Sequence, residues 1–359
     1  MGDIRNMLNT RTTSTTHTTG TTLATRDARD ARDTEMTVIA DDAVPLAGTL
    51  TLPDGPGPHP AALLHGSGPL DRDGDTAKLR MGLGAPLAAA LASAGIAVLR
   101  YDRRGCGDTP GDWRTAGFTG NRRDAAAAVR ALAAHPDIRA DAIAVIGHSE
   151  GAVHAMSLGA RTPEEQSPGT QPPDEQPEIK ALVLLAGFAR VGEDAFRWQG
   201  RSIARTLPAP ARLLLPALRA LAERQLTRVK NTTTDVARVL GVPVNARWMR
   251  EMLRHDSRTD LAAIRAPVLA VTGDKDLQVN PADLDEIRRL VPGETEVHRV
   301  RDLTHLLRRD AGKPSMRSYG RLQREPVDPD LLAQVADWLG RQLHNTPRDT
   351  DAAQRTAPS

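Results

Sequence analysis

The chain has very little cysteine and no long apolar run. Cys106 is the single cysteine among 359 residues, so an intrachain disulfide is excluded. No Cys/His cluster has the spacing of a structural zinc site. Nowhere does an apolar run reach the roughly 18 residues that span a bilayer, and the first 35 residues lack the apolar segment of a signal peptide. These absences predict a soluble, cytoplasmic protein that has no membrane span and needs no metal or other cofactor.

Aromatic residues and charge of a single sign are also scarce. Aromatics make up 3% of the chain and hydrophobic residues 40%, so the core must be aliphatic. The 47 basic and 45 acidic residues nearly cancel, and they are interleaved in runs such as Arg26-Asp27-Ala28-Arg29-Asp30. A nucleic-acid-binding surface needs basic residues gathered on one face. We therefore expect no nucleic-acid partner, which leaves small molecules as the expected substrates.

What the sequence does contain is an alternation of short β-branched runs and Ala/Leu-rich stretches. This pattern is typical of a mostly parallel sheet that is covered by helices on both faces. We therefore predict an α/β fold with an eight-stranded sheet, in which the first two strands form an antiparallel hairpin. The predicted strands are 36–40, 46–52, 60–64, 96–101, 142–147, 180–186, 267–273 and 295–300, and the predicted helices are 76–93, 119–134, 150–161, 281–291 and 328–343.

The composition divides the chain into a core, an insertion and two tails. Residues 1–35 are predicted to be a disordered tail, because their polar side chains cannot bury enough surface to offset the entropy of ordering. Translation that begins at Met36 is the alternative explanation. Residues 190–258 fall between two core strands, have a helical pattern and contain no predicted strand, so we expect a helical cap. It is predicted to be a mobile lid, with permanently packed helices as the alternative. The remaining ranges are the core, 36–189 and 259–345, and a flexible tail, 346–359.

A candidate nucleophile lies directly after the predicted strand 142–147. The run Gly147-His148-Ser149-Glu150-Gly151 matches the pattern G-x-S-x-G between a strand and a helix. In that context the glycines permit a sharp turn, and the serine hydroxyl projects at the helix N-terminus. The motif alone also fits a glycine-rich turn with an incidental serine, so the assignment of Ser149 depends on finding its catalytic partners.

Those partners are sought downstream, because a serine hydroxyl needs a base and the base needs an orienting acid. After such an elbow the chain order is serine, acid, histidine. Asp276 follows one predicted strand and His305 follows the next, and parallel sheets gather their sites at these carboxyl ends. Among the histidines, His305 alone has the right order and loop placement. Asp274 is the alternative acid, but an Asp directly after Gly more often caps a turn, so we favour Asp276.

Stabilisation of an oxyanion requires two backbone N–H donors near the nucleophile. The residue after the serine supplies one, which is Glu150, and the loop after the third strand supplies the other. That loop reads His65-Gly66-Ser67-Gly68, and we assign the second donor to the N–H of Ser67. The Glu150 carboxylate lies in the first turn of a helix, where the helix dipole favours it by about 0.3–1 kcal/mol. It could also repel anionic substrates.

Taken together, these residues resemble the α/β-hydrolase superfamily, specifically its bacterial esterase-like members. The motifs are HGSGPLDRDGD, YDRRGCGDT, GHSEG, GDKDLQV and LTHLL, and the resemblance covers about residues 36–343. It implies a catalytic triad and an oxyanion hole at the positions named above. It also implies that Asp102 and Arg104 are structural partners without a catalytic role. A dehalogenase of this fold would have Asp at the elbow and a dienelactone hydrolase would have Cys, so Ser149 argues against both.

The expected function is hydrolysis of a carboxylic ester or thioester through an acyl-enzyme on Ser149. His305 acts as the general base and Asp276 as the orienting acid in this prediction. A peptidase or amidase is the alternative within the enzyme class, because the same triad cleaves amides when a pocket recognises an amino terminus. A non-catalytic ligand-binding relative is the alternative outside it, although such a protein would be expected to lack a member of the triad.

Overall fold

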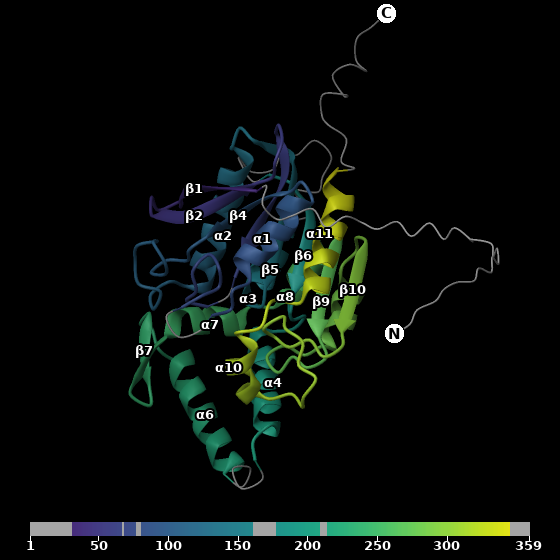
Figure 1. Cartoon of the computed structure of the whole chain (residues 1–359). Helices are drawn as coiled ribbons and strands as arrows, with labels where there is room; N and C mark the ends of the chain where they lie inside the picture. Colours follow the sequence, from purple (N-terminus) through teal and green to yellow (C-terminus); the bar gives the residue numbers. More distant parts are fainter. Residues whose placement is uncertain (1–30, 67, 77–79, 161–176, 209–213, 345–359) are drawn as a thin grey trace, which may run out of the picture.

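One eight-stranded sheet runs through the computed structural model, which describes residues 31–66, 68–76, 80–160, 177–208 and 214–344 (Figure 1). The strand order is β1-β2-β4-β3-β5-β6-β9-β10. β2 is antiparallel to both β1 and β4, and the remaining pairs are parallel. The predicted fold class is therefore confirmed. The strands are β1 (Arg32–Ile39), β2 (Pro45–Leu52), β3 (His59–His65), β4 (Ala97–Tyr101), β5 (Ile138–His148), β6 (Ile179–Leu185), β9 (Val268–Gly273) and β10 (Thr295–Val300).

Helices cover both faces of this sheet with aliphatic side chains. One buried cluster joins the sheet to α2 (Phe118–Ala133), α3 (Glu150–Gly159), α8 (Ser257–Ala263) and α9 (Asp283–Leu290). A second cluster joins the opposite face to α1 (Gly84–Ser93) and α11 (Pro329–His344). Strand β4 is buried along its whole length, as expected for a strand covered on both faces. Because β3, β5, β6, β9 and β10 are parallel, the loops that follow them gather at one edge of the sheet.

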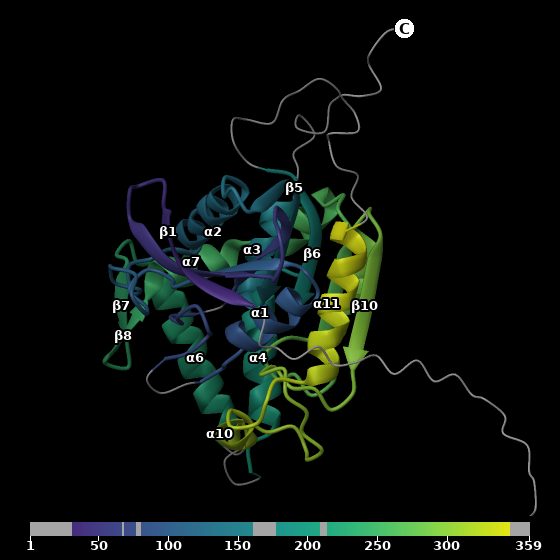
Figure 2. The same cartoon turned by 45° about the horizontal axis from the view of Figure 1, so that its top comes forward.

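The described part of the predicted cap, residues 190–208 and 214–258, lies beyond that edge (Figure 1). It contains α4 (Gly192–Arg205), α6 (Leu215–Lys230) and α7 (Ala246–Arg254). In both views α4 and α6 project away from the sheet, and the short helix α10 (Tyr319–Leu322), which follows the 3₁₀ turn at Met316–Ser318, lies near α4 (Figures 1 and 2).

The prediction that the cap contains no strand is wrong. β7 (Val236–Val239) and β8 (Val242–Asn245) pair as an antiparallel hairpin. Its two-residue turn, Leu240-Gly241, has φ of 49° and 84°. Positive φ at both turn residues matches the right-handed twist of the strands and is typical of tight hairpins. The local signal for this hairpin is the Leu-Gly turn between Val239 and Val242, followed by the alternating Val242 and Val244.

The boundary of the N-terminal tail also needs correction. Residues 32–35 pair with β2, from Arg32 opposite Leu52 to Glu35 opposite Thr49. Their polar side chains suit a strand at the edge of a sheet, where one face meets water. Composition alone therefore placed them wrongly in a disordered tail. Residues 1–30 and 345–359, which include the rest of that tail and the predicted C-terminal one, lie outside the described residues.

Candidate active site

Ser149 lies in a strained turn at the carboxyl edge of the sheet. It sits between the end of β5 and the start of α3, with φ of 58° and ψ of −118°. Such a conformation is unfavourable for a residue with a Cβ and persists only where the surroundings impose it. The glycines help to impose it, since a Cβ at Gly147 would lie 2.0 Å from the carbonyl oxygen of Gly151. The Ser149 N–H donates to the carbonyl of Leu185 at 2.8 Å, which ties the turn to β6.

Asp276 and His305 meet at the same edge, after β9 and β10. The Nδ1 of His305 donates to Oδ2 of Asp276 at 2.8 Å, and each residue is 4% exposed. The other carboxylate oxygen, Oδ1, accepts from the backbone N–H groups of Gln278 and Val279 at 2.7 and 2.8 Å. Asp276 is therefore fixed at both oxygens. With Nδ1 engaged as a donor, Nε2 of His305 is the nitrogen left to accept a proton.

Asp274, the alternative acid, has a different partner. Its Oδ1 accepts from the backbone N–H of Asp302 at 2.7 Å, across the loops that follow β9 and β10. This bond stabilises the loop that leads to His305. Of the two acids considered from the sequence, it is thus Asp276 whose carboxylate meets the histidine.

His148 connects the elbow to the histidine loop. Its Nε2 donates to the backbone carbonyl of His305 at 2.9 Å, and the two imidazole centroids are 4.8 Å apart. Burial lowers the pKa of His148 to about 3, and the neighbouring His305 acts in the same direction. His148 is therefore neutral at ordinary pH and serves as a hydrogen-bond donor. This contact holds the loop of His305 against the turn that carries Ser149.

The Glu150 carboxylate is buried, 6% exposed, and accepts hydrogen bonds from several segments. Arg103 donates to both oxygens at 2.8 and 3.1 Å, and His154 on the same helix donates at 3.0 Å. The Gly68 N–H donates at 3.2 Å, and Nε1 of Trp248 in the cap donates at 2.9 Å. Burial by itself would raise the pKa of Glu150, but the Arg103 charge and the His154 and Arg103 hydrogen bonds hold it well below its usual range.

This network changes the role expected for the Glu150 side chain. The sequence predicts a favourable position at the helix N-terminus, with repulsion of anionic substrates as a further possibility, whereas in the structure a buried arginine compensates the charge. Residues far apart in sequence supply its partners, with separations of 47 for Arg103, 82 for Gly68 and 98 for Trp248. No local motif indicates contacts between residues so far apart, so this role could not be predicted from the sequence.

The loop after β3 is held by the same network. Ser67, the expected second oxyanion donor, lies outside the described residues. Its neighbour Gly68 donates its N–H to Glu150 and accepts from Arg103 Nη1 at 2.9 Å through its carbonyl. The loop is thus anchored at the residue next to Ser67, and the anchor is the side chain that follows Ser149.

The residues of the turn after β4 have structural partners. The Asp102 carboxylate accepts from the backbone N–H of Arg72 at 2.7 Å and from its guanidinium at 2.8 and 3.1 Å. Arg104 forms ion pairs with Asp42 and Asp124 at 2.6 and 2.7 Å. These contacts agree with the structural roles that the resemblance implied for Asp102 and Arg104.

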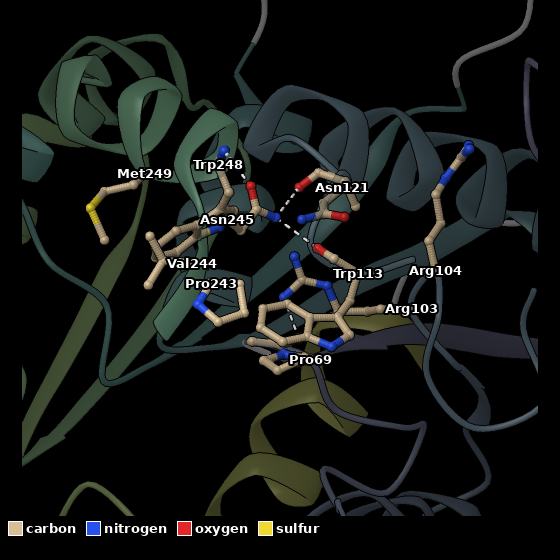
Figure 3. Close-up of a pocket in the computed structure, with 12 residues that line it drawn as sticks. Pro69, Arg103, Arg104, Trp113, Asn121, Pro243, Val244, Asn245, Trp248 and Met249 are labelled. Atoms are coloured by element: carbon tan, nitrogen blue, oxygen red, sulfur yellow. Dashed lines mark hydrogen bonds between the residues drawn. The ribbon is translucent and has the colours of Figure 1, made fainter. Parts of the chain in front are cut away.

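An apolar cavity of about 220 Å³ opens between the core and the cap (Figure 3). We name it the Trp113–Trp248 cavity after its two aromatic walls. Its remaining lining residues are Gly68, Pro69, Arg103, Arg104, Ala116, Asn121, Pro243, Val244, Asn245 and Met249.

Among residues 31–66, 68–76, 80–160, 177–208 and 214–344, no group of three or more His, Cys, Asp and Glu side chains is arranged to hold a metal ion. Within the same ranges, none of the helices combines the length and the apolar character that crossing a membrane requires.

Known proteins share this chain's sequence pattern and fold. The family described as serine aminopeptidase S33 matches residues 80–311. Esterase EstD of Thermotoga maritima is 26% identical over 302 residues, a match that covers 82% of this chain and 65% of the relative, slightly less than two thirds of its length. The ferulic acid complex of Est1E from Butyrivibrio proteoclasticus has a TM-score of 0.56 at 17% identity and covers 87% and 98% of the two chains. A Pyrococcus furiosus esterase has a TM-score of 0.54 at 17% identity and covers 88% and 93%. At such identities these structures show the fold alone.

Proposed function

The chain belongs to the α/β-hydrolase superfamily, within the family described as serine aminopeptidase S33, and from this premise we propose that it is a serine hydrolase that cleaves a carboxylic ester or thioester. The observation that carries the proposal is the buried hydrogen bond between Asp276 and His305, next to the strained turn of Ser149. The esterase relative from Thermotoga maritima supports the same substrate class.

In the proposed mechanism, Ser149 Oγ attacks the carbonyl carbon while Nε2 of His305 takes the hydroxyl proton. Asp276 holds the Nδ1–H and stabilises the imidazolium that forms. The backbone N–H groups of Ser67 and Glu150 donate to the oxyanion. His305 then returns the proton to the departing alcohol or thiol, which leaves the acyl group on Ser149. In the second half, His305 takes a proton from water, the hydroxide attacks the acyl carbonyl, and the free acid departs as Ser149 regains its proton.

An aminopeptidase or amidase is the second candidate, because the family description names a serine aminopeptidase. Recognition of a substrate amino terminus calls for a carboxylate or other acceptor aimed at the ammonium group. The described lining of the Trp113–Trp248 cavity includes no acidic side chain. This observation favours an ester or thioester over a peptide with a free amino terminus.

The test is labelling of the full chain with a fluorophosphonate probe, together with hydrolysis of p-nitrophenyl esters and aminoacyl p-nitroanilides. We expect Ser149 to be labelled and the esters to be the better substrates. Ser149→Ala should lose both labelling and about 10⁶ in turnover, the usual cost of removing a triad nucleophile. Near wild-type activity in a folded Ser149→Ala variant would contradict the proposal, and faster cleavage of the anilides would favour the aminopeptidase.

A further inference from the structure

The Trp113–Trp248 cavity has walls that suit an apolar ring or branched chain. Two of the chain's four tryptophans face it, although aromatics make up only 3% of the sequence. Val244 and Met249 of the cap add aliphatic surface (Figure 3). The Arg114 guanidinium lies 5.1 Å from the Trp113 ring centroid, a cation–π contact that helps to orient the indole.

The two arginines in the wall are already paired within the protein. Arg103 gives its guanidinium to Glu150 and to the carbonyl of Gly68. Arg104 is held by Asp42 and Asp124. A carboxylate or phosphate on a ligand would have to compete with these bonds to gain a charged partner. The wall therefore offers burial of apolar surface and no available counter-ion.

The polar groups of the wall serve mainly to position it. Asn245 Nδ2 donates to the backbone carbonyls of Trp113 and Ala116, both at 2.7 Å. Its Oδ1 accepts from the backbone N–H of Trp248 at 2.8 Å. The Trp248 indole N–H is engaged by Glu150. Trp248 is thus held at its backbone N–H and at its indole N–H, and Trp113 is held at its backbone carbonyl. Asn121 adds one neutral amide to the wall.

The cavity is linked to the proposed reaction centre through Glu150. Gly68, whose N–H binds the Glu150 carboxylate, belongs both to the wall and to the loop next to Ser67. Trp248, another residue of the wall, donates its indole N–H to the same carboxylate. Glu150 directly follows Ser149, so the carboxylate that both wall residues bind belongs to the residue next to the proposed nucleophile.

We propose that the Trp113–Trp248 cavity is the subsite for an uncharged apolar substituent of the ester, namely one aromatic ring or a branched aliphatic chain. The proposal deepens the proposed function and rests on it. An engineered apolar cavity of about 150 Å³ binds benzene. The volume here, about 220 Å³, therefore accommodates one ring with a small substituent. The substituent comes either from the acyl group or from the alcohol.

Two series of esters distinguish these sources. The acyl series consists of methyl acetate, methyl 2-methylpropanoate and methyl benzoate, and the alcohol series consists of methyl, 2-methylpropyl and benzyl acetates. One methylene in an apolar pocket changes kcat/KM by about 10- to 200-fold. Methyl acetate is the smallest member of both series. In one series we expect the bulkier esters to have a kcat/KM at least about tenfold above that of methyl acetate, and this series identifies the source of the substituent. No gain in either series, in an enzyme that cleaves the methyl esters, would overturn the subsite.

Variants of the wall and of a neighbouring position provide the control. Val244→Trp fills the cavity and should lower the ratio of bulky to small ester at least about tenfold. Val242→Trp, two residues away on β8 at a side chain that is 61% exposed, should leave the ratio unchanged. If Val244→Trp fails to fold, Trp113→Ala provides the opposite change, an enlarged cavity that shifts preference toward naphthyl esters. Equal ratios in Val244→Trp, Val242→Trp and the wild type would contradict the assignment.

Calorimetric titration of the full chain separates this proposal from the catalytic one. Benzyl alcohol should bind the wild type, benzoate should bind at least about tenfold more weakly, and Val244→Trp should lose the binding of benzyl alcohol. If Ser149 is labelled but benzyl alcohol binds Val244→Trp as it binds the wild type, the subsite is wrong and the hydrolase is not. If Ser149 is not labelled and no ester is cleaved, the proposed function fails, and with it the role of the cavity as an ester subsite.

Discussion

The carboxyl edge of the sheet and the cap hold their residues in different ways. At the sheet edge, Asp276 and His305 are buried and bonded to each other, and further backbone bonds fix the carboxylate. In the cap, helix α6 lies wholly within the described residues, and Val229 is the one residue that it buries. Leu218 of the same helix is 50% exposed. The acid and the base of the proposed mechanism are thus held by hydrogen bonds at the sheet edge. Helix α6, by contrast, has few buried side chains, and local opening is least costly in such an element.

Helix α7 belongs to the cap in sequence but is bonded to the core. Trp248 donates to Glu150, Asn245 donates to the carbonyl of Ala116, and Glu251 accepts from the backbone N–H of Thr119 at 2.7 Å. It packs against α2 of the core on one side and against α4 and α6 on the other. The boundary between residues that are bonded to the core and residues that have few buried contacts therefore lies within the cap, and not at residues 190 and 258.

The largest effect is expected at the sheet edge, on exchanging the carboxylate that His305 contacts. Asp276→Asn should lower turnover by about 10⁴, because an amide there favours the wrong tautomer of the histidine. Asp274→Asn is the matched control two residues away, since its side chain binds the backbone of Asp302. Its effect on kcat should stay within about tenfold. Steady-state kinetics on one p-nitrophenyl ester checks both variants, and a crippled Asp274→Asn beside an active Asp276→Asn would reverse the assignment.

The next effect concerns Glu150, which joins the elbow to the cap. Glu150→Gln leaves Arg103 buried without its counter-charge, and breaking a buried ion pair in this way costs about 3–5 kcal/mol. Urea denaturation should therefore show a free energy of unfolding lower by that amount.

An exposed ion pair provides the matched control for this measurement. Glu286→Gln removes the partner of Arg289 on α9, where the arginine side chain is 65% exposed. Such surface pairs contribute about 0–1 kcal/mol, so this variant should unfold close to the wild-type midpoint. Equal losses in Glu150→Gln and Glu286→Gln would show that the network around Glu150 does not stabilise the junction.

The sequence predicted that Asp276 and His305 lie together at the sheet edge, and the reason is the order of its motifs. A strand, a G-x-S-x-G turn and a helix are contiguous, so local sequence defines the position of Ser149. Asp276 and His305 were found because parallel strands bring the loops after them to one edge, whatever their separation along the chain. Strand ends and chain order carried these predictions, and neither depends on knowing how side chains pack.

The cap was predicted less well because its contacts are long-range. The hairpin of β7 and β8 has strands of four residues and a Leu-Gly turn, a weaker signal than the Asn-Gly turns that mark most tight hairpins. In the sequence, Trp248 is one apolar residue of an amphipathic helix. No neighbouring residue in the sequence indicates that its indole N–H donates to Glu150. Which polar atom pairs with which emerges only once the core has positioned α7.

The smallest effect is expected within the cap, where hydrogen exchange distinguishes α6 from α7. We predicted from the sequence that residues 190–258 form a mobile lid, and the contacts of α7 restrict that expectation to part of the segment. Amides of α6 should exchange at least about tenfold faster than those of α7 in the free protein, because α6 is largely exposed and is held by surface ion pairs such as Lys230–Glu193 and Arg197–Glu223.

A covalent inhibitor on Ser149 should slow exchange in α6 and leave α7 nearly unchanged, since closure of a lid adds contacts where few exist. Asn245→Ala is the informative variant, because it removes the side chain that caps the N-terminus of α7. The same change removes the bonds of this side chain to the carbonyls of Trp113 and Ala116. Loss of a helix N-cap costs about 0.5–2 kcal/mol, so exchange in α7 should rise toward that of α6. Equal protection of the two helices in the free wild type, unchanged by the inhibitor, would mean that the cap is a static insertion, in which α6 and α7 differ in exposure and not in motion.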